Sequence, residues 1–254
     1  MGVATSFAPV RFINSRIPNQ ILESTSSYGS SIHETKLFRS KSIIGLARFI
    51  VQEFPEGVPI FNMSCSYGHE PYSIALILAD QLGGLDKVAE RYPIFASDRS
   101  REVIDFANHG VLWVDDKNQD TLDQFKASEH IINPIRVDDN ITEFQVSEEL
   151  FNVVRFRVNN LIDEVRNIDS QAPVVIIARN VWYYLDADSM KNFILTLTDK
   201  LAVGSILSMS NGDSQWSYYG RYPVGNYFAC IYDDISARTE ERDIFWEKTI
   251  FQKK

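Results

Sequence analysis

The residues with the clearest chemical potential lie in one stretch, Ser64–Glu70, which reads SCSYGHE. An apolar run, Val58–Met63, precedes it and predicts a buried strand. Pro71 and the apolar residues up to Leu82 follow it and predict a helix that stops at Gly83. A loop between a strand and a helix exposes backbone N–H groups at the carboxyl edge of a parallel sheet, where α/β proteins bind nucleotides and related cofactors. We therefore expect a cofactor site at this loop.

Two acidic side chains stand where such a site would use them. Asp98 follows a second predicted strand, Tyr92–Ala96, where doubly wound folds place an acid for a ribose diol. An ordinary helix cap at Asp98 or Ser100 explains the same pattern without a ligand. Glu70 either meets the ammonium group of a ligand or complements the N-terminal end of the helix. The loop matches neither G-x-G-x-x-G nor the P-loop pattern, so a ligand without phosphates fits better.

The surrounding elements alternate between strands and helices, which predicts an α/β fold with a doubly wound, mostly parallel sheet. Helical periodicity covers much of Ile32–Phe54. At the C-terminal end, Tyr227–Tyr232 and Ile244–Phe251 are expected to form an antiparallel edge pair, separated by a charged turn around Arg238–Arg242. The other predicted elements are a short helix at Arg101–Asn108, a strand at Val174–Ala178, a helix at Ser189–Leu201 and a strand at Ser205–Met209.

Composition suggests how the chain divides into domains. Residues 1–31 are rich in serine and have little periodicity, so we expect an arm or linker there. Residues 32–254 are then expected to form the folded domain. Within it, residues 113–155 are polar and irregular, and we expect a small insertion in which Ile141–Val146 and Val153–Val158 pair as strands.

The overall composition limits the classes of partner. The 254 residues carry a formal net charge of −9, which argues against broad binding to nucleic acid or anionic membranes. The two cysteines, Cys65 and Cys230, lack metal-ligand spacing and are expected to be reduced thiols. No run of about 18 apolar residues and no signal-peptide core is present, so no membrane insertion is expected. We predict a cytoplasmic protein without a metal site, whose partners are proteins or small molecules.

The run SYGHEPYSIALIL resembles the S-T-G-E-E-P-Y-S-I-A loop and helix of the chemotaxis receptor methyltransferase (CheR) family. The resemblance extends, with its blocks in the same order, from about Ile32 to Gln215. The other blocks are His33–Arg39 beside the family's N-x-T-x-F-F-R, Ala96–Asp98 beside A-[ST]-D, Asn160–Leu161 beside N-L, and Ala178–Tyr184 beside C-R-N-V-x-I-Y.

This resemblance implies a Rossmann-like class I methyltransferase fold, S-adenosylmethionine as cofactor and methylation of a protein glutamate, as on chemoreceptors. For the bare sequence, Arg39 also fits a surface salt bridge and Tyr184 an amphipathic core position. The roles that the family implies are as follows: Thr35 and Arg39 reach over the cofactor, Glu70 binds its methionine portion, Asp98 its ribose, Asn160 and Leu161 its adenine side, Arg179 and Asn180 line the pocket, and Arg39 and Tyr184 flank the transferred methyl group.

The sequence also departs from the family pattern. His33, Tyr67 and His69 replace an asparagine, a threonine and a glutamate, and Ser210–Asn211 stands where the family continues into Ser-Glu. The chain starts close to the catalytic domain, so we expect it to lack the basic helical domain that family members use on receptors. Two alternatives to a glutamate methyltransferase follow: a catalytically impaired, cofactor-binding regulatory module, or a methyltransferase of another acceptor. The sequence does not indicate an oligomeric state.

Overall fold

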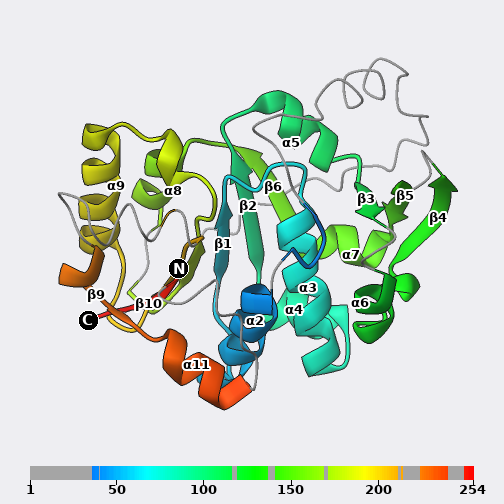
Figure 1. Cartoon of the computed structure of the whole chain (residues 1–254), viewed down its shortest axis with the longest axis horizontal. Coiled ribbons are helices and arrows are strands. Elements are labelled where there is room, and N and C mark those ends of the chain that lie inside the picture. Colours follow the sequence, from blue (N-terminus) through cyan, green and yellow to red (C-terminus); the bar gives the residue numbers. More distant parts are fainter. Residues whose placement is uncertain are drawn as a thin grey trace, which may run out of the picture. The chain divides into compact units, whose positions relative to one another are not determined.

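The computed structural model describes residues 36–39, 41–115, 119–136, 141–168, 171–210, 213, 224–239 and 249–254. The predicted arm, residues 1–31, lies outside these ranges. Within them, seven strands form one sheet in the order β6-β2-β1-β7-β8-β10-β9 (Figure 1). The first five in this order are parallel, and β10 runs antiparallel to both β8 and β9. The strands are β1 Ile60–Met63, β2 Ile94–Asp98, β6 Val154–Val158, β7 Val175–Ile177, β8 Ile206–Ser208, β9 Phe228–Cys230 and β10 Ile250–Lys253.

Helices cover both faces of this sheet, because alternate strand residues point into two separate hydrophobic cores. In β7, Val175 and Ile177 belong to one core, whereas Ile176 belongs to the other. The first core packs against α2, α3 and α4, and the second packs against α8 and α9 (Figure 1). The sheet is therefore doubly wound, as predicted. The bounds of these helices are α2 Lys41–Glu53, α3 His69–Leu82, α4 Leu85–Arg91, α8 Leu161–Arg166 and α9 Ala187–Lys200.

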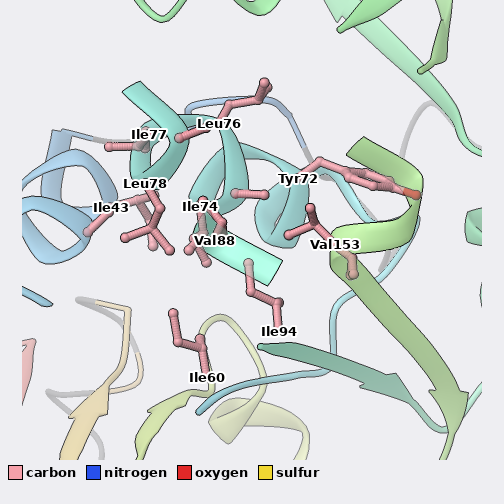
Figure 2. Close-up of a cluster of buried hydrophobic side chains, with 14 of the residues drawn as sticks. Ile43, Ile60, Tyr72, Ile74, Leu76, Ile77, Leu78, Val88, Ile94 and Val153 are labelled. Atoms are coloured by element: carbon pink, nitrogen blue, oxygen red, sulfur yellow. The ribbon is translucent and has the colours of Figure 1, made fainter. Parts of the chain in front are cut away.

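Helix α3 is the central helix of the first core. All its residues from Tyr72 to Ala79 are buried, which fits a helix that is apolar on nearly every side. Figure 2 shows Ile74 in a cluster of buried side chains that also includes Val88 of α4 and Ile60 and Ile94, the first residues of β1 and β2. The helix ends at Gly83, whose φ of 77° places it in the left-handed region that favours glycine. The predicted strand–loop–helix unit is confirmed, although α3 begins before Pro71, at His69.

A second, three-stranded antiparallel sheet, β3-β5-β4, forms the predicted insertion. The prediction that Ile141–Val146 pairs with Val153–Val158 is wrong: β5 pairs with β3 and β4, whereas β6 pairs parallel to β2 in the large sheet. A local pattern identifies a strand but not its partner, and a parallel partner is reached only through a long crossover. The elements between β2 and β6 are α5 Arg101–Ala107, β3 Val111–Asp115, α6 Gln119–Gln124, η2 Ala127–Glu129, β4 Ile131–Arg136, β5 Ile141–Val146 and α7 Glu148–Val153.

The predicted antiparallel pair at the C-terminal end is confirmed in β9 and β10. The charged turn predicted around Arg238–Arg242 is wrong in its first residues, because Tyr232–Thr239 forms helix α11. This helix is held by tertiary contacts: Ile235 is buried, and the guanidinium of Arg238 lies 4.8 Å from the centre of the Phe49 ring in α2. Among the described residues, no helix combines the length and apolar character needed to cross a membrane.

Candidate cofactor site

The loop between β1 and α3 has an unusual backbone. Ser64, Ser66 and Gly68 all have positive φ, of 60°, 51° and 89°. Non-glycine residues in this region cost conformational energy and are found where surrounding contacts enforce them, often at ligand sites. Cys65 lies between the two serines and is buried, and burial raises the pKa of its thiol, which therefore stays protonated. The Ser64–Glu70 loop therefore has a specific backbone conformation that surrounding contacts enforce, and it lies at the carboxyl edge of the sheet.

Asp98, the last residue of β2, holds this loop. Its Oδ2 accepts a hydrogen bond from the Ser66 N–H at 3.1 Å, and its Oδ1 accepts one from the Ser100 N–H at 3.0 Å. Ser100 itself caps α5 by accepting from the Val103 N–H. A carboxylate has about four acceptor positions, so these two bonds leave room for the two hydroxyls of a ribose. The geometry fits both the structural and the ligand-binding interpretation of Asp98.

Glu70 lies in the first turn of α3 and connects three elements. Its Oε1 accepts from the Asn62 Nδ2 of β1 at 2.8 Å, and its Oε2 lies 3.4 Å from a guanidinium nitrogen of Arg179, which follows β7. The Arg179 side chain is buried, whereas that of Glu70 is 20% exposed. Within the described residues, the buried Oδ1 of Asn62 receives no hydrogen bond. Carboxylate and amide oxygens together suit a cationic donor, and the ammonium group of S-adenosylmethionine is one.

Arg179 and Asn180 form the turn that follows β7. Asn180 has a φ of 56°, and its N–H donates to the carboxylate of Asp213. The sequence interpretation missed Asp213. A signal was present, since Ser210 and Asp213 show the spacing of a capping box and exchange its reciprocal bonds, Ser210 N–H to Asp213 Oδ2 and Asp213 N–H to Ser210 Oγ.

Asn160 and Leu161 follow β6, the strand that pairs with β2. The Asn159 N–H donates to the Asp98 carbonyl at 2.9 Å, which brings this segment beside the end of β2. Asn160 caps α8 by accepting from the Asp163 N–H at 2.9 Å, and Leu161 is half-buried. This segment therefore lies beside the edge at which Asp98 lies, and the adenine-side role of Asn160 and Leu161 stays a prediction.

Two side chains were assigned to the methyl path, and both are exposed. The segment that carries Arg39 is fixed to α3: the Phe38 N–H donates to Ser73 Oγ at 2.8 Å, and Ser73 Oγ donates to the His69 carbonyl. Tyr184 is 43% exposed in η3, Trp182–Tyr184, just after the Arg179–Asn180 turn. Thr35 lies outside the described residues.

The two loop residues that depart from the family, Tyr67 and His69, both pack against Trp113 of β3. The His69 ring stacks on the Trp113 ring with 5.8 Å between centres, and its Nε2 accepts from the Trp113 N–H at 3.0 Å. Tyr67 contacts Trp113 edge-on at 5.3 Å. Burial lowers the pKa of His69 to about 4, so its ring is neutral at physiological pH. Through these contacts, the two substituted side chains connect the insertion to the Ser64–Glu70 loop.

Sequence comparisons find distant relatives. The chain is 26% identical over 155 residues to the "Chemotaxis protein methyltransferase" of Salmonella typhimurium, covering 61% of this chain and 51% of the relative. It is 27% identical over 190 residues to "Chemotaxis protein methyltransferase 2" of Vibrio cholerae, covering 72% and 63%. It is also 27% identical over 202 residues to the "Probable biofilm formation methyltransferase WspC" of Pseudomonas aeruginosa, covering 76% and 45%. The chain thus spans less than two thirds of the length of each of these relatives.

Solved structures give weaker similarities. The plantazolicin methyltransferase BpumL in complex with SAH is 14% identical, with a TM-score of 0.39, covering 79% of this chain and 57% of that one. Monomeric WbdD is 10% identical, with a TM-score of 0.42, covering 73% and 34%. At such low TM-scores, neither likeness supports a conclusion about this chain.

The family comparison is decisive. The family described as "CheR methyltransferase, SAM binding domain" matches residues 33–215, which include every residue assigned above to the cofactor and the methyl path. The same residues form the five parallel strands of the doubly wound sheet and the loop between β1 and α3. The protein therefore belongs to the CheR methyltransferase family, through the domain that binds S-adenosylmethionine.

Proposed function

We propose that this protein transfers a methyl group from S-adenosylmethionine to a glutamate carboxylate of a protein, with chemoreceptor-like proteins as the acceptor class. The observation that carries the proposal is the joining of Glu70, Arg179 and Asp98 around one loop in a CheR-family domain. The names of two relatives, both chemotaxis methyltransferases, support the acceptor class.

The reaction needs little acid–base assistance from the protein. S-adenosylmethionine supplies, when bound, an electrophilic methyl group on a positively charged sulfur. The acceptor carboxylate is already ionised near neutral pH, and it forms the new oxygen–carbon bond as the carbon–sulfur bond breaks. The opposite charges of carboxylate and sulfonium are both consumed, so the protein contributes chiefly by positioning the acceptor and excluding water.

The exposed side chains fit the acceptor side of this reaction. Arg39 brings a positive charge that can hold a carboxylate by paired hydrogen bonds, and the Tyr184 hydroxyl can donate one more. Both side chains lie on segments fixed by buried neighbours, Phe38 and Trp182. We assign Arg39 and Tyr184 to the orientation of the acceptor carboxylate.

The substitutions at Tyr67 and His69 do not favour the alternative of an impaired module. Both side chains pack against Trp113, and they leave Glu70, Asp98 and Arg179 joined to the loop. The changes therefore alter how the loop is supported rather than which groups face the ligand.

The insertion is our candidate for the surface that meets the acceptor protein. Strand β4 is an outer edge of its sheet and exposes Ile132 and Ile135. Its register is interrupted between these two residues, where Asn133 has a positive φ and Pro134 lacks an N–H. An acceptor peptide could therefore pair with the β4 main chain only over short stretches on either side of this interruption, next to the exposed Ile132 and Ile135 side chains.

The test is a product analysis with methyl-labelled S-adenosylmethionine and purified cytoplasmic fragments of chemoreceptors. Carboxyl methyl esters hydrolyse in base and release labelled methanol, whereas methyl groups on nitrogen do not. We expect base-labile label on protein. Label confined to base-stable products, or to small molecules, would assign another acceptor, and cofactor binding without any transfer would favour the regulatory module.

Tyr184→Phe separates catalysis from binding. The substitution removes one hydroxyl that we assign to the acceptor, so kcat should fall by about tenfold or more, while the affinity for S-adenosylhomocysteine changes by no more than about twofold. Steady-state kinetics and calorimetry give the two quantities. Tyr92→Phe is the matched control. Tyr92 precedes the amino end of β2, away from the site at the carboxyl end, and its hydroxyl donates to the Phe54 carbonyl. Removing this hydroxyl should leave kcat unchanged. Equal losses of rate and affinity in Tyr184→Phe would place that residue in cofactor binding.

A further inference from the structure

Asp213 gathers backbone donors from two separate loops. Its side chain is fully buried. Its Oδ1 accepts from the Trp182 N–H at 2.9 Å, and its Oδ2 accepts from the N–H groups of Asn180 and Ser210 and from the Ser210 hydroxyl. Two of these donors belong to the turn after β7 and two to the segment after β8. A carboxylate that only capped its own segment would need only the Ser210 bonds.

The turn after β7 requires such an acceptor. Asn180 is left-handed, with a φ of 56°, a conformation that costs free energy for any residue except glycine and is less costly for asparagine than for most. Buried N–H groups also cost free energy when they are left without acceptors. The Asp213 carboxylate satisfies the N–H groups of Asn180 and Trp182, and the Trp182 indole N–H donates back to the Ala178 carbonyl at 2.9 Å. The turn is thus fixed by bonds on both sides of Asn180.

The residue fixed between these bonds is Arg179. It directly precedes the left-handed Asn180, and its buried guanidinium lies 3.4 Å from Glu70 Oε2. Rotation of the Asn180 backbone out of the left-handed region would redirect the chain at Arg179 and separate this pair. We assign Glu70 to the ammonium group of the cofactor. A change in the hydrogen bonds of Asp213 would therefore alter ligand binding through the Arg179–Glu70 pair.

We propose that Asp213 is a positioning residue of the cofactor site: it holds the Arg179–Asn180 turn so that Arg179 orients Glu70 for the ligand. This inference rests on the assignment of Glu70 and Arg179 to cofactor binding. If Asp213 had a purely structural role, its substitution would lower the stability of the protein but leave the affinity of the folded protein for S-adenosylhomocysteine unchanged.

The test is a double-mutant cycle on the full chain with Asp213→Asn and Arg179→Met, read by calorimetric affinity for S-adenosylhomocysteine well below the unfolding temperature of each variant. Asp213→Asn should weaken binding by about tenfold or more. In the Arg179→Met background, the same substitution should cost no more than about twofold, because its effect passes through Arg179. Asp186→Asn is the control: Asp186 likewise accepts a backbone bond, from the Ser189 N–H at 2.7 Å, and affinity should be unchanged.

Unchanged affinity in Asp213→Asn, or the same loss in both backgrounds, would overturn the inference while leaving the site assignment intact. Unchanged affinity in Arg179→Met would remove Arg179 from the cofactor site and the inference with it. If Asp213→Asn does not fold, Asp213→Glu takes its place in the cycle with the same expectations, since it keeps the charge but displaces the carboxylate by one methylene.

Discussion

Glu70→Gln is expected to weaken the binding of S-adenosylhomocysteine by roughly 10- to 150-fold, the equivalent of about 1.5–3 kcal/mol for hydrogen bonds to a charged group. Glutamine keeps the size of the side chain and an oxygen for Asn62, but it removes the negative charge that faces both the proposed ammonium position and the buried Arg179. The free protein should also unfold at a lower temperature, because a buried guanidinium loses its counter-charge.

Calorimetry on the folded variant measures this affinity, and Glu53→Gln is the matched control. Glu53 also pairs with an arginine, Arg238, at 3.1 Å, but at the surface and on α2. A surface pair contributes about 0–1 kcal/mol, so its loss should leave ligand affinity unchanged and stability nearly so. If Glu70→Gln bound the ligand as tightly as the parent protein, the methionine portion would lie elsewhere.

Acidification should destabilise the protein through His69. An unfolded histidine takes up a proton below pH 6.5, whereas burial lowers the pKa of folded His69 to about 4. The unfolded state therefore binds more protons between these pH values, and the contribution of neutral His69 to stability is complete above pH 6.5 and is lost as the pH falls toward about 4. The difference between the two pKa values corresponds to about 3 kcal/mol.

The measurement is the free energy of unfolding by denaturant in the parent and in His69→Gln, at neutral pH and at about pH 4. Glutamine can still accept the Trp113 N–H through its oxygen but does not titrate, so the parent should lose about 3 kcal/mol more than this variant on acidification. His109→Gln, at an exposed position, should behave as the parent does. Identical acid sensitivity in the parent and in His69→Gln would show that His69 is not kept neutral by the fold.

The sequence predicted the parts of the fold that depend on local pattern. The strand, loop and helix around Ser64–Glu70 were predictable because apolar periodicity, a helix-compatible proline and a terminal glycine occur in one short stretch. Pairing was less predictable. The partner of β6 depends on a crossover of many residues, and helix α11 depends on the contacts of Ile235 and Arg238 with other elements. Neither kind of contact leaves a periodic signal in its own segment.

The candidate site divides in the same way. Glu70, Asp98 and Arg179 were predictable from family motifs, and the structure joins them to the loop through direct bonds and the ion pair. Asp213 was missed as a site residue because two of its four donors, the N–H groups of Asn180 and Trp182, come from a turn about 30 residues earlier in the chain. This proximity is created by the pairing of the neighbouring parallel strands β7 and β8. His69 was identified only as a departure from the family pattern, since its contact with Trp113 depends on how the insertion folds back on the loop.

The most direct test of the cofactor site is a crystal structure of the protein with S-adenosylhomocysteine. We expect the ribose hydroxyls within hydrogen-bond distance of the Asp98 carboxylate, the ammonium group beside Glu70, and the adenine against the segment that begins at Asn160. The Arg179–Glu70 pair and the left-handed Asn180 should be retained in the complex. A ligand bound away from the Ser64–Glu70 loop, or one whose ribose makes no contact with Asp98, would contradict the site described here.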